Sequence, residues 1–209
     1  ALDEINKDLS SSKKMFRLLQ GDVGSGKTIV SLLSALNTIY SGFQVAVMAP
    51  TEILARQHFN LAKKLFPKEI SIEMISGKSE YREKKKIYKK LETNKIDILF
   101  GTHALFQNKI LFKKLGLIII DEQHKFGVNQ RKRLSDKGGK DCDVLLMTAT
   151  PIPRTLTMTI YGDMDLSIIK EKPKNRKPIK TYSKLENNIN DIINFIKKEI
   201  NFGNQIFWV

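Results

Sequence analysis

The 209-residue sequence predicts an α/β fold, in which a mostly parallel sheet is covered by helices on both faces. Apolar strand-like runs alternate with helical patterns from Phe16 to Met147, and this alternation is typical of a parallel sheet. The run LGLIII, at Leu115–Ile120, is apolar almost throughout, as expected for a central strand buried on both faces. A glycine-rich segment, QGDVGSGKT, joins the first predicted strand to the first predicted helix.

The individual elements follow from the length and spacing of the apolar residues. Short continuous apolar runs predict strands, and longer stretches with helical periodicity predict helices. In chain order the expected elements are strand Phe16–Gln20, helix Thr28–Tyr40, strand Phe43–Met48, helix Ile53–Phe66, strand Ile70–Ile75, helix Ser79–Leu91, and strands Ile96–Gly101, Leu115–Ile120 and Val144–Met147.

The character of the chain changes after Tyr161. The segment KEKPKNRKPIK contains six basic residues, one acid and two prolines, so we expect an extended connector. A strand at Ile179–Tyr182, a helix with an isoleucine face and a final strand in NQIFWV are expected to follow. We therefore expect a first domain at 1–162, a connector at 163–180 and the beginning of a truncated second domain at 181–209. A last strand without partners, and a start at Ala1, indicate a fragment.

Composition and charge restrict the classes of partner. The formal net charge of +14 favours a polyanion such as nucleic acid, although lysine-rich drift at solvated positions is an alternative. No apolar run approaches the roughly 18–20 residues of a membrane span, so no membrane partner is expected. Cys142 is the only cysteine and is interpreted as structural. Without a secretory signal at the N-terminus, the cytoplasm is the expected location.

The glycine-rich segment fits the pattern Gly-x4-Gly-Lys-[Ser/Thr], and Gly21–Thr28 is called the phosphate loop below. Glycines at 21, 24 and 26, together with Ser25, let backbone amides curl around an anion at a helix N-terminus. Lys27 is expected to reach the β- and γ-phosphates, and the Thr28 hydroxyl to bind Mg²⁺. ATP and Mg²⁺ are the cofactors that these residues predict. The alternative is a glycine-rich turn with an accidental lysine.

The buried run at Leu115–Ile120 stops at the acidic pair Asp121-Glu122. Burying two carboxylates beside an apolar strand is costly unless a cation or a reaction needs them. Asp121 is therefore expected to hold the nucleotide's Mg²⁺, and Glu122 to polarise the water that attacks the γ-phosphate. With Lys27, these are the expected catalytic residues. An acidic pair alone is uninformative, but one placed after such a strand and a phosphate loop is a specific signal.

Several motifs together make the chain resemble the superfamily-two helicases, and within them the RecG family of bacterial ATP-dependent DNA helicases. The resemblance spans nearly the whole chain, in the blocks RLLQGDVGSGKT (17–28), APTEILARQH (49–58), GTHALFQ (101–107), IIIDEQHKFGVNQR (118–131), MTATPIPRTL (147–156) and YGDMDLS (161–167). It implies a RecA-like fold for the first domain and the start of a second RecA-like domain. Transcription-repair coupling factors share two of these blocks, but Gln123 followed by HKFGV favours RecG.

The resemblance also implies roles outside the nucleotide site. Gln123 and His124 would couple that site to the TAT segment, Thr148, Ala149 and Thr150, whose hydroxyls can rearrange hydrogen bonds when the γ-phosphate leaves. Backbone contacts to DNA are implied for four residues beyond the ends of two strands: Thr51, Arg56, Thr102 and His103. Helix capping at Thr51 and turn chemistry at Thr102 are the alternatives, as is a hydrogen-bonded structural role for His124.

The function implied by the resemblance is ATP-driven translocation on branched DNA, such as stalled forks and recombination intermediates. In that family a second motor domain supplies an arginine to the γ-phosphate and an N-terminal wedge domain recognises the fork; both are missing here. We therefore expect ATP binding with little turnover, and a monomer. The alternatives are a coupling-factor-like translocase, and a non-enzymatic nucleic-acid-binding module with a vestigial nucleotide site. A small-molecule kinase is disfavoured because DEQH and TATP would then have no role.

Overall fold

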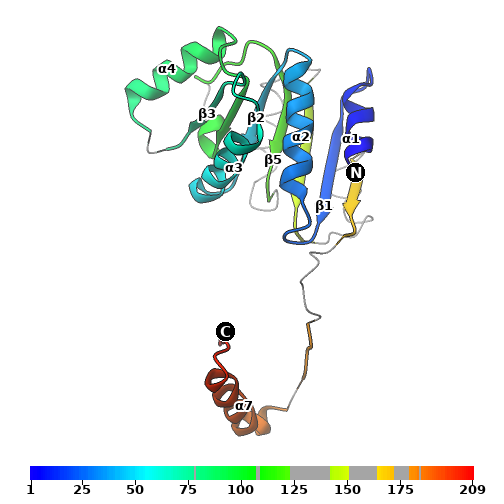
Figure 1. The fold of residues 1–209 in the computed structure, drawn as a ribbon, viewed down its shortest axis with the longest axis vertical. Coiled ribbons are helices and arrows are strands. Elements are labelled where there is room, and N and C mark those ends of the chain that lie inside the picture. Colours follow the sequence, from blue (N-terminus) through cyan, green and yellow to red (C-terminus); the bar gives the residue numbers. More distant parts are fainter. Residues whose placement is uncertain (78, 107–108, 123–141, 151–163, 172–178, 184) are drawn as a thin grey trace. The chain divides into compact units, whose positions relative to one another are not determined.

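A computed structural model describes residues 1–77, 79–106, 109–122, 142–150, 164–171, 179–183 and 185–209. The chain forms two compact units, residues 1–173 and 174–209. The elements of the first unit are α1 (Leu2–Leu9), β1 (Phe16–Gly21), α2 (Lys27–Tyr40), β2 (Gln44–Met48), α3 (Glu52–Leu65), β3 (Ile72–Ile75), α4 (Tyr81–Glu92), β4 (Ile98–Gly101), the 3₁₀ helix η1 (His103–Phe106), β5 (Leu115–Ile120), β6 (Asp143–Thr148) and β7 (Asp165–Ile169). Those of the second are the 3₁₀ helix η3 (Glu186–Asn188) and α7 (Ile189–Asn201). Figure 1 labels most of these helices and strands.

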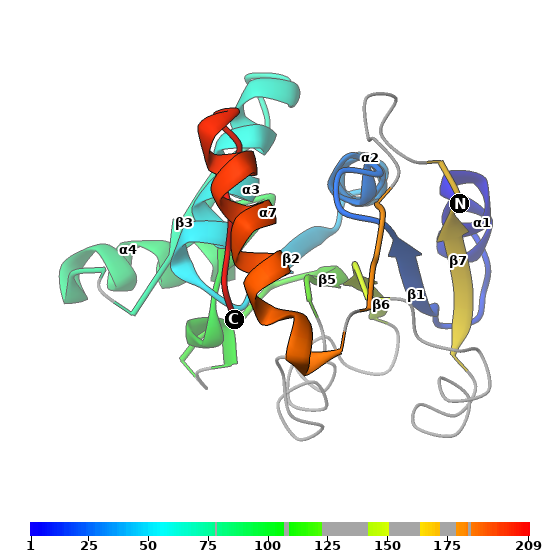
Figure 2. The same cartoon turned by 90° about the horizontal axis from the view of Figure 1, so that it is seen from below.

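The first unit is built on a seven-stranded sheet with the order β3-β4-β2-β5-β6-β1-β7. Every strand pair is parallel, and Figure 2 shows the strands following one another from β3 to β7. β5 lies in the middle of the order, and five of its six residues are buried. The parallel sheet and its buried central strand were both predicted from the apolar runs, and both are confirmed.

Two hydrophobic clusters lie on opposite faces of this sheet, because successive side chains of a strand point to opposite sides. One cluster joins alternate strand residues to α1, α2 and α3, through side chains such as Ile5, Leu32 and Ala62. The other joins the intervening residues to α4 and η1, through Ile87 and Leu105 among others. Helices therefore cover both faces, as the alternation of strands and helices predicted.

Two elements at the β7 edge of the sheet were not predicted. Helix α1 packs its buried Ile5 into the core formed by α2 and the sheet. Strand β7 lies within the expected connector at 163–180, yet it pairs with β1 from Arg17↔Asp165 to Gly21↔Ile169. The sheet thus extends beyond residue 162, while the expected domain boundaries themselves stay a prediction.

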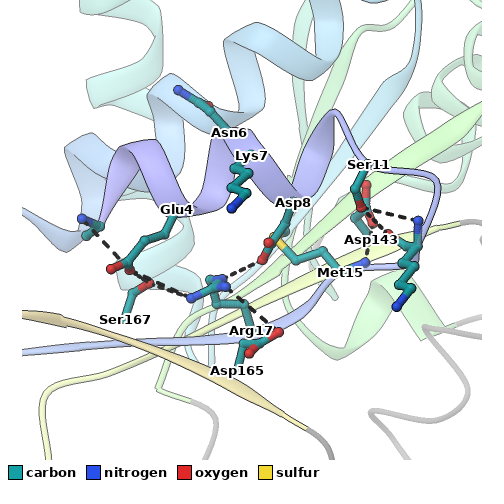
Figure 3. A network of polar contacts seen from close by, with 12 residues as sticks. Glu4, Asn6, Lys7, Asp8, Ser11, Met15, Arg17, Asp143, Asp165 and Ser167 are labelled. Atoms are coloured by element: carbon teal, nitrogen blue, oxygen red, sulfur yellow. Dashed lines mark hydrogen bonds and ion pairs between the residues drawn. The ribbon is translucent and has the colours of Figure 1, made fainter.

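Arg17 on β1 joins both of these elements through a network of polar contacts (Figure 3). Its Nε donates to Asp8 Oδ2 of α1 at 2.6 Å, and its Nη1 donates to the Ser167 hydroxyl of β7 at 2.9 Å. Ser167 in turn donates to Glu4, and this hydrogen bond lowers the pKa of the Glu4 carboxyl. Asp165 lies 3.8 Å from Nη2. A single buried guanidinium on β1 therefore binds both α1 and β7.

A second buried polar side chain, Gln44 of β2, makes four hydrogen bonds in another part of the first unit. Its Nε2 donates to the carbonyls of Leu91 and Ile96, at 3.1 and 2.8 Å. Its Oε1 accepts from the backbone amides of Lys113 and Lys114, at 2.8 and 3.0 Å. This one amide therefore links the end of α4 to the segment that enters β5.

We expect Gln44→Glu to lower the free energy of unfolding by about 2 kcal/mol, because a carboxylate cannot donate to the two carbonyls it would face. Urea denaturation measures this change. Gln57→Glu, at an exposed position of α3, is the matched control and should shift stability by less than about 0.5 kcal/mol. Equal effects of the two substitutions would contradict the bridging role of Gln44.

The second unit contains η3 and α7, and the helix predicted from the isoleucine pattern is confirmed at Ile189–Asn201. The strand predicted at Ile179–Tyr182 is wrong, as is the final strand in NQIFWV; both segments are exposed and form neither helix nor strand. A strand needs a partner for its backbone hydrogen bonds, and the described residues of this unit provide none. Apolar sequence alone therefore overpredicted strands there.

Cys142 is fully buried at the entry to β6, in agreement with its interpretation as structural. Burial raises the pKa of its thiol to about 12, so almost no thiolate forms near neutral pH. In the part of the chain that the structure describes, no helix is both long and apolar enough to cross a membrane.

Candidate functional site

The predicted site residues follow strands that end at one edge of the sheet, because all seven strands are parallel. β1 leads into the phosphate loop, its neighbour β6 into the TAT segment, and the next strand, β5, into the acidic pair. β2 and β4 continue the row on the far side of β5. Register supports this arrangement, since Gln20 pairs with Thr148 and Met48 with Ile120. The edge therefore assembles the predicted nucleotide residues on three adjacent strands.

The phosphate loop turns sharply from β1 into α2. Gly24 and Gly26 have φ values of 78° and 96°, in the left-handed region that favours glycine. The Ser25 amide donates to the Asp22 carbonyl at 3.1 Å, which closes the turn. α2 begins at Lys27, so the free amides of its first turn face the loop.

Lys27 lies across this loop. Its Nζ donates to the carbonyls of Gly21 at 2.8 Å and Asp22 at 2.9 Å. These contacts hold the half-buried ammonium of Lys27 at the N-terminus of α2. The helix dipole also favours a bound anion at this end. The arrangement provides a cation and several amide donors for an anionic group.

The loop has unused polar atoms for a ligand. Among the described residues, two buried side-chain oxygens have no hydrogen-bond partner, Gln20 Oε1 and Ser25 Oγ, and both lie in or beside the loop. A Cβ at Gly21 would lie 2.5 Å from Ser25 Oγ, so the close approach of these residues requires glycine. Thr28 and Asp121 offer hard oxygen ligands, and Mg²⁺ commonly takes one or two protein oxygens together with phosphates. The residues present therefore fit a magnesium nucleotide.

Gly21→Ala is expected to raise the Kd for a magnesium–nucleotide complex about tenfold, because overpacking typically costs about 1–3 kcal/mol. The added methyl would meet Ser25 Oγ and, at 3.2 Å, Ile169 Cβ of β7. Calorimetric titration measures the change. Gly77→Ala is the matched control, since nothing lies within 4 Å of a Cβ there. Unchanged binding by the Gly21 variant would show that the loop can open without loss of its function.

The acidic pair is held firmly at the end of β5. The backbone amide of Asp121 donates to the Met48 carbonyl at 2.8 Å, and its Oδ1 accepts from the Glu122 amide at 3.0 Å. Glu122 has a φ of 48°, an uncommon conformation for a residue with a side chain and one that stores local strain. The backbone therefore turns abruptly where the two acidic residues follow β5.

Asp121 has a partner that sequence reasoning missed. His58 Nε2 lies 2.7 Å from Asp121 Oδ2, and the two residues are 9% and 8% exposed. His58 shares the buried face of α3 with Ala55 and Ala62. A histidine on the apolar face of a predicted helix was the available signal, but its partner is 63 positions away in sequence.

The TAT segment forms a compact hydroxyl cluster after β6. The Thr148 and Thr150 hydroxyls lie 2.8 Å apart, and the Thr150 amide donates to Thr148 Oγ1 at 3.2 Å. Thr148 is buried and Thr150 is exposed. Gln123 and His124, the other predicted coupling residues, lie outside the described residues. Their coupling role stays a prediction.

The predicted DNA-contact residues lie after β2 and β4. Thr51 caps α3, with its Oγ1 accepting from the Leu54 amide at 3.3 Å, and this matches the capping alternative. Arg56 is exposed and pairs with Glu52 one turn earlier, at 3.2 Å. Thr102 precedes η1, which begins at His103. Both loops thus face the same edge as the phosphate loop, and their DNA contacts stay a prediction.

Comparisons with known proteins agree with this geometry. Residues 3–159 match a family model described as DEAD/DEAH box helicase. The chain is 48% identical to the ATP-dependent DNA helicase RecG of Borreliella burgdorferi over its whole length, and 49% identical to that of Bacillus subtilis over 99% of its length. The chain spans 30% of the length of each of these relatives.

Solved structures show the same likeness. A structure of RecG bound to a three-way DNA junction superposes with a TM-score of 0.79 at 42% identity, over 97% of this chain and 27% of that one. Mss116p bound to ssRNA and AMP-PNP superposes with a TM-score of 0.63 at 20% identity, over 91% and 45% of the two chains, which shows the fold alone. The RecA-like α/β fold expected from the motifs is therefore confirmed.

Proposed function

Because this chain belongs to the DEAD/DEAH box helicase family, we propose that it is the ATP-binding motor domain of a RecG-type DNA helicase. The observation that carries the proposal is the edge of the sheet, where the phosphate loop, the TAT segment and the acidic pair follow three adjacent strands. A glycine-rich turn with an accidental lysine would not need Asp121 buried at the same edge.

Each residue of the site has a defined part in this proposal. The phosphate-loop amides and Lys27 bind the phosphates, while Thr28 and Asp121 hold the metal. When bound, Mg²⁺ neutralises charge on the β- and γ-phosphates. Glu122 orients and polarises the attacking water. The chain's contribution is thus positioning and charge stabilisation, without a covalent intermediate.

Branched DNA is the proposed partner of the intact protein. The similar RecG structure is bound to a three-way DNA junction, and the net charge of +14 suits a phosphate backbone. Thr51, Arg56, Thr102 and His103 would contact that backbone without reading its sequence. We place the protein, as a monomer, in the cytoplasm with its DNA.

The chain spans 30% of the length of the RecG relatives it matches, and the proposed activity of a whole helicase also needs the remaining length. A second motor domain would supply an arginine at the γ-phosphate, and such residues are worth about 10³–10⁵ in rate. A wedge domain would supply recognition of the fork. We therefore expect this chain to bind ATP with little turnover, and to bind DNA weakly with a steep dependence on salt.

Calorimetric titration with a non-hydrolysable ATP analogue tests the proposal, in Mg²⁺ and again in EDTA. One equivalent should bind, and more tightly with Mg²⁺. A chain that binds forked DNA at low salt but no nucleotide under either condition would instead be a nucleic-acid-binding module with a vestigial site. Rapid ATP turnover by this chain alone would contradict the need for a second motor domain.

A further inference from the structure

We propose that His58 is a positioning residue, which holds the Asp121 carboxylate in the orientation that binds the metal of a metal–nucleotide complex. This inference rests on the proposed function. The contact that supports it joins α3 to the end of β5, where His58 Nε2 lies 2.7 Å from Asp121 Oδ2. The two side chains are each only 11% exposed, so water does not compete strongly for the contact.

The direction of this hydrogen bond follows from chemistry. An ionised carboxylate only accepts hydrogen bonds, so Nε2 carries the hydrogen and donates it. Asp121 Oδ1 meanwhile accepts from the Glu122 amide at 3.0 Å. The two oxygens are thus held by donors from different elements, which fixes the plane of the carboxylate. Each oxygen keeps a further lone pair for a metal ion or its water.

The geometry also gives His58 a second connection. It lies seven positions after Thr51, the residue that caps α3, or about 10 Å along a helix at 1.5 Å per residue. Arg56 is exposed on the same helix. A shift of α3 along its axis would therefore move the donor of Asp121.

Two amide substitutions test the role, because they differ in reach. The side-chain nitrogen of glutamine extends about as far as Nε2 of histidine, whereas that of asparagine extends only about as far as Nδ1. His58→Gln should therefore keep the bond to Asp121, and His58→Asn should lose it. Both replace a buried imidazole by an amide, so each is the other's control for packing. Thermal unfolding by circular dichroism establishes that both chains are folded.

The measured quantity is a ratio for the ATP analogue, its Kd in EDTA divided by its Kd in Mg²⁺. A high ratio means that Mg²⁺ strengthens binding. We expect H58N to lower this ratio about tenfold, as is typical when a partner of a metal ligand is lost. H58Q should keep the ratio within about threefold of the parent, and binding in EDTA should be nearly equal in all three chains. Equal ratios in the three chains would overturn the inference, as would an equal loss of affinity with and without Mg²⁺.

A measurement on the unaltered chain applies even if H58N does not fold. The Nε2 proton of His58, followed by NMR in the nucleotide complex, should shift when Mg²⁺ is added. A resonance that does not move would overturn the positioning role. The two proposals also fail differently: a parent chain that binds no nucleotide refutes the proposed function, whereas a parent that binds it with a ratio insensitive to H58N refutes this inference alone.

Discussion

Lys27→Ala is expected to weaken binding of a magnesium–ATP analogue on the order of 100-fold. The substitution removes the half-buried ammonium that spans the loop carbonyls of Gly21 and Asp22. In the bound state this group would donate charge-assisted hydrogen bonds to the phosphates, and each such bond contributes about 1.5–3 kcal/mol. A loss of about 3 kcal/mol corresponds to roughly two powers of ten in Kd.

Two further variants separate geometry from charge. Lys86→Ala lowers the net charge equally, but Lys86 is exposed on α4, so binding should stay within about twofold of the parent. Lys27→Arg keeps the charge and replaces a compact ammonium by a planar fork. It should bind nearly as poorly as Lys27→Ala, because the loop between Gly21 and α2 is fitted to the smaller group. Similar Kd values for the parent and both Lys27 variants would refute a phosphate-binding loop.

Arg17→Met is expected to lower the free energy of unfolding by about 3 kcal/mol. Methionine keeps the apolar stem but loses the donors to Asp8 at 2.6 Å and Ser167 at 2.9 Å, each a charge-assisted bond. The contacts to Glu4 and Asp165 add little, since those carboxylates are 55% and 69% exposed. Most of the lost stability is therefore expected from two hydrogen bonds, one to Asp8 of α1 and one to Ser167 of β7.

Urea denaturation measures this loss, and a double-mutant cycle locates it. If Arg17 acts mainly through Asp8, then Asp8→Asn should destabilise much less in the Arg17→Met background than in the parent. Arg82→Met, at an exposed position of α4, is the control for removing an arginine. A change no larger than that of the control would mean that α1 and β7 are held by apolar packing alone.

The sequence allowed the core of the sheet to be predicted because its strands are buried on both faces. Runs such as LGLIII are apolar enough to be recognised without knowing their partners. The phosphate loop was equally readable, since its glycines, Lys27 and Thr28 are fixed by local backbone chemistry. Both depend on interactions within one short segment.

The features that were missed depend on partners distant in sequence. β7, DLSII, has only one fully buried residue, Ser167, because it is an edge strand with a polar contact to Arg17. In the sequence, His58 looks like any residue on the buried face of an amphipathic helix. Its contact with Asp121 is recognised only when the fold brings the end of β5 to α3. In the opposite direction, the run at 204–209 is apolar enough for a strand but pairs with none of the residues that the structure describes. Local composition cannot distinguish these cases.

The parallel pairing of β7 with β1 also has a mechanical consequence. β7 is the last described strand before the second unit, and its ladder ends at Gly21↔Ile169, beside the start of the phosphate loop. A pull along the strand axis at Ile169 loads the slanted, evenly spaced bonds of this ladder together, in shear. They share the tension and do not unzip one after another. A pull in this direction would therefore reach the strand that carries the phosphate loop without first peeling the edge of the sheet away.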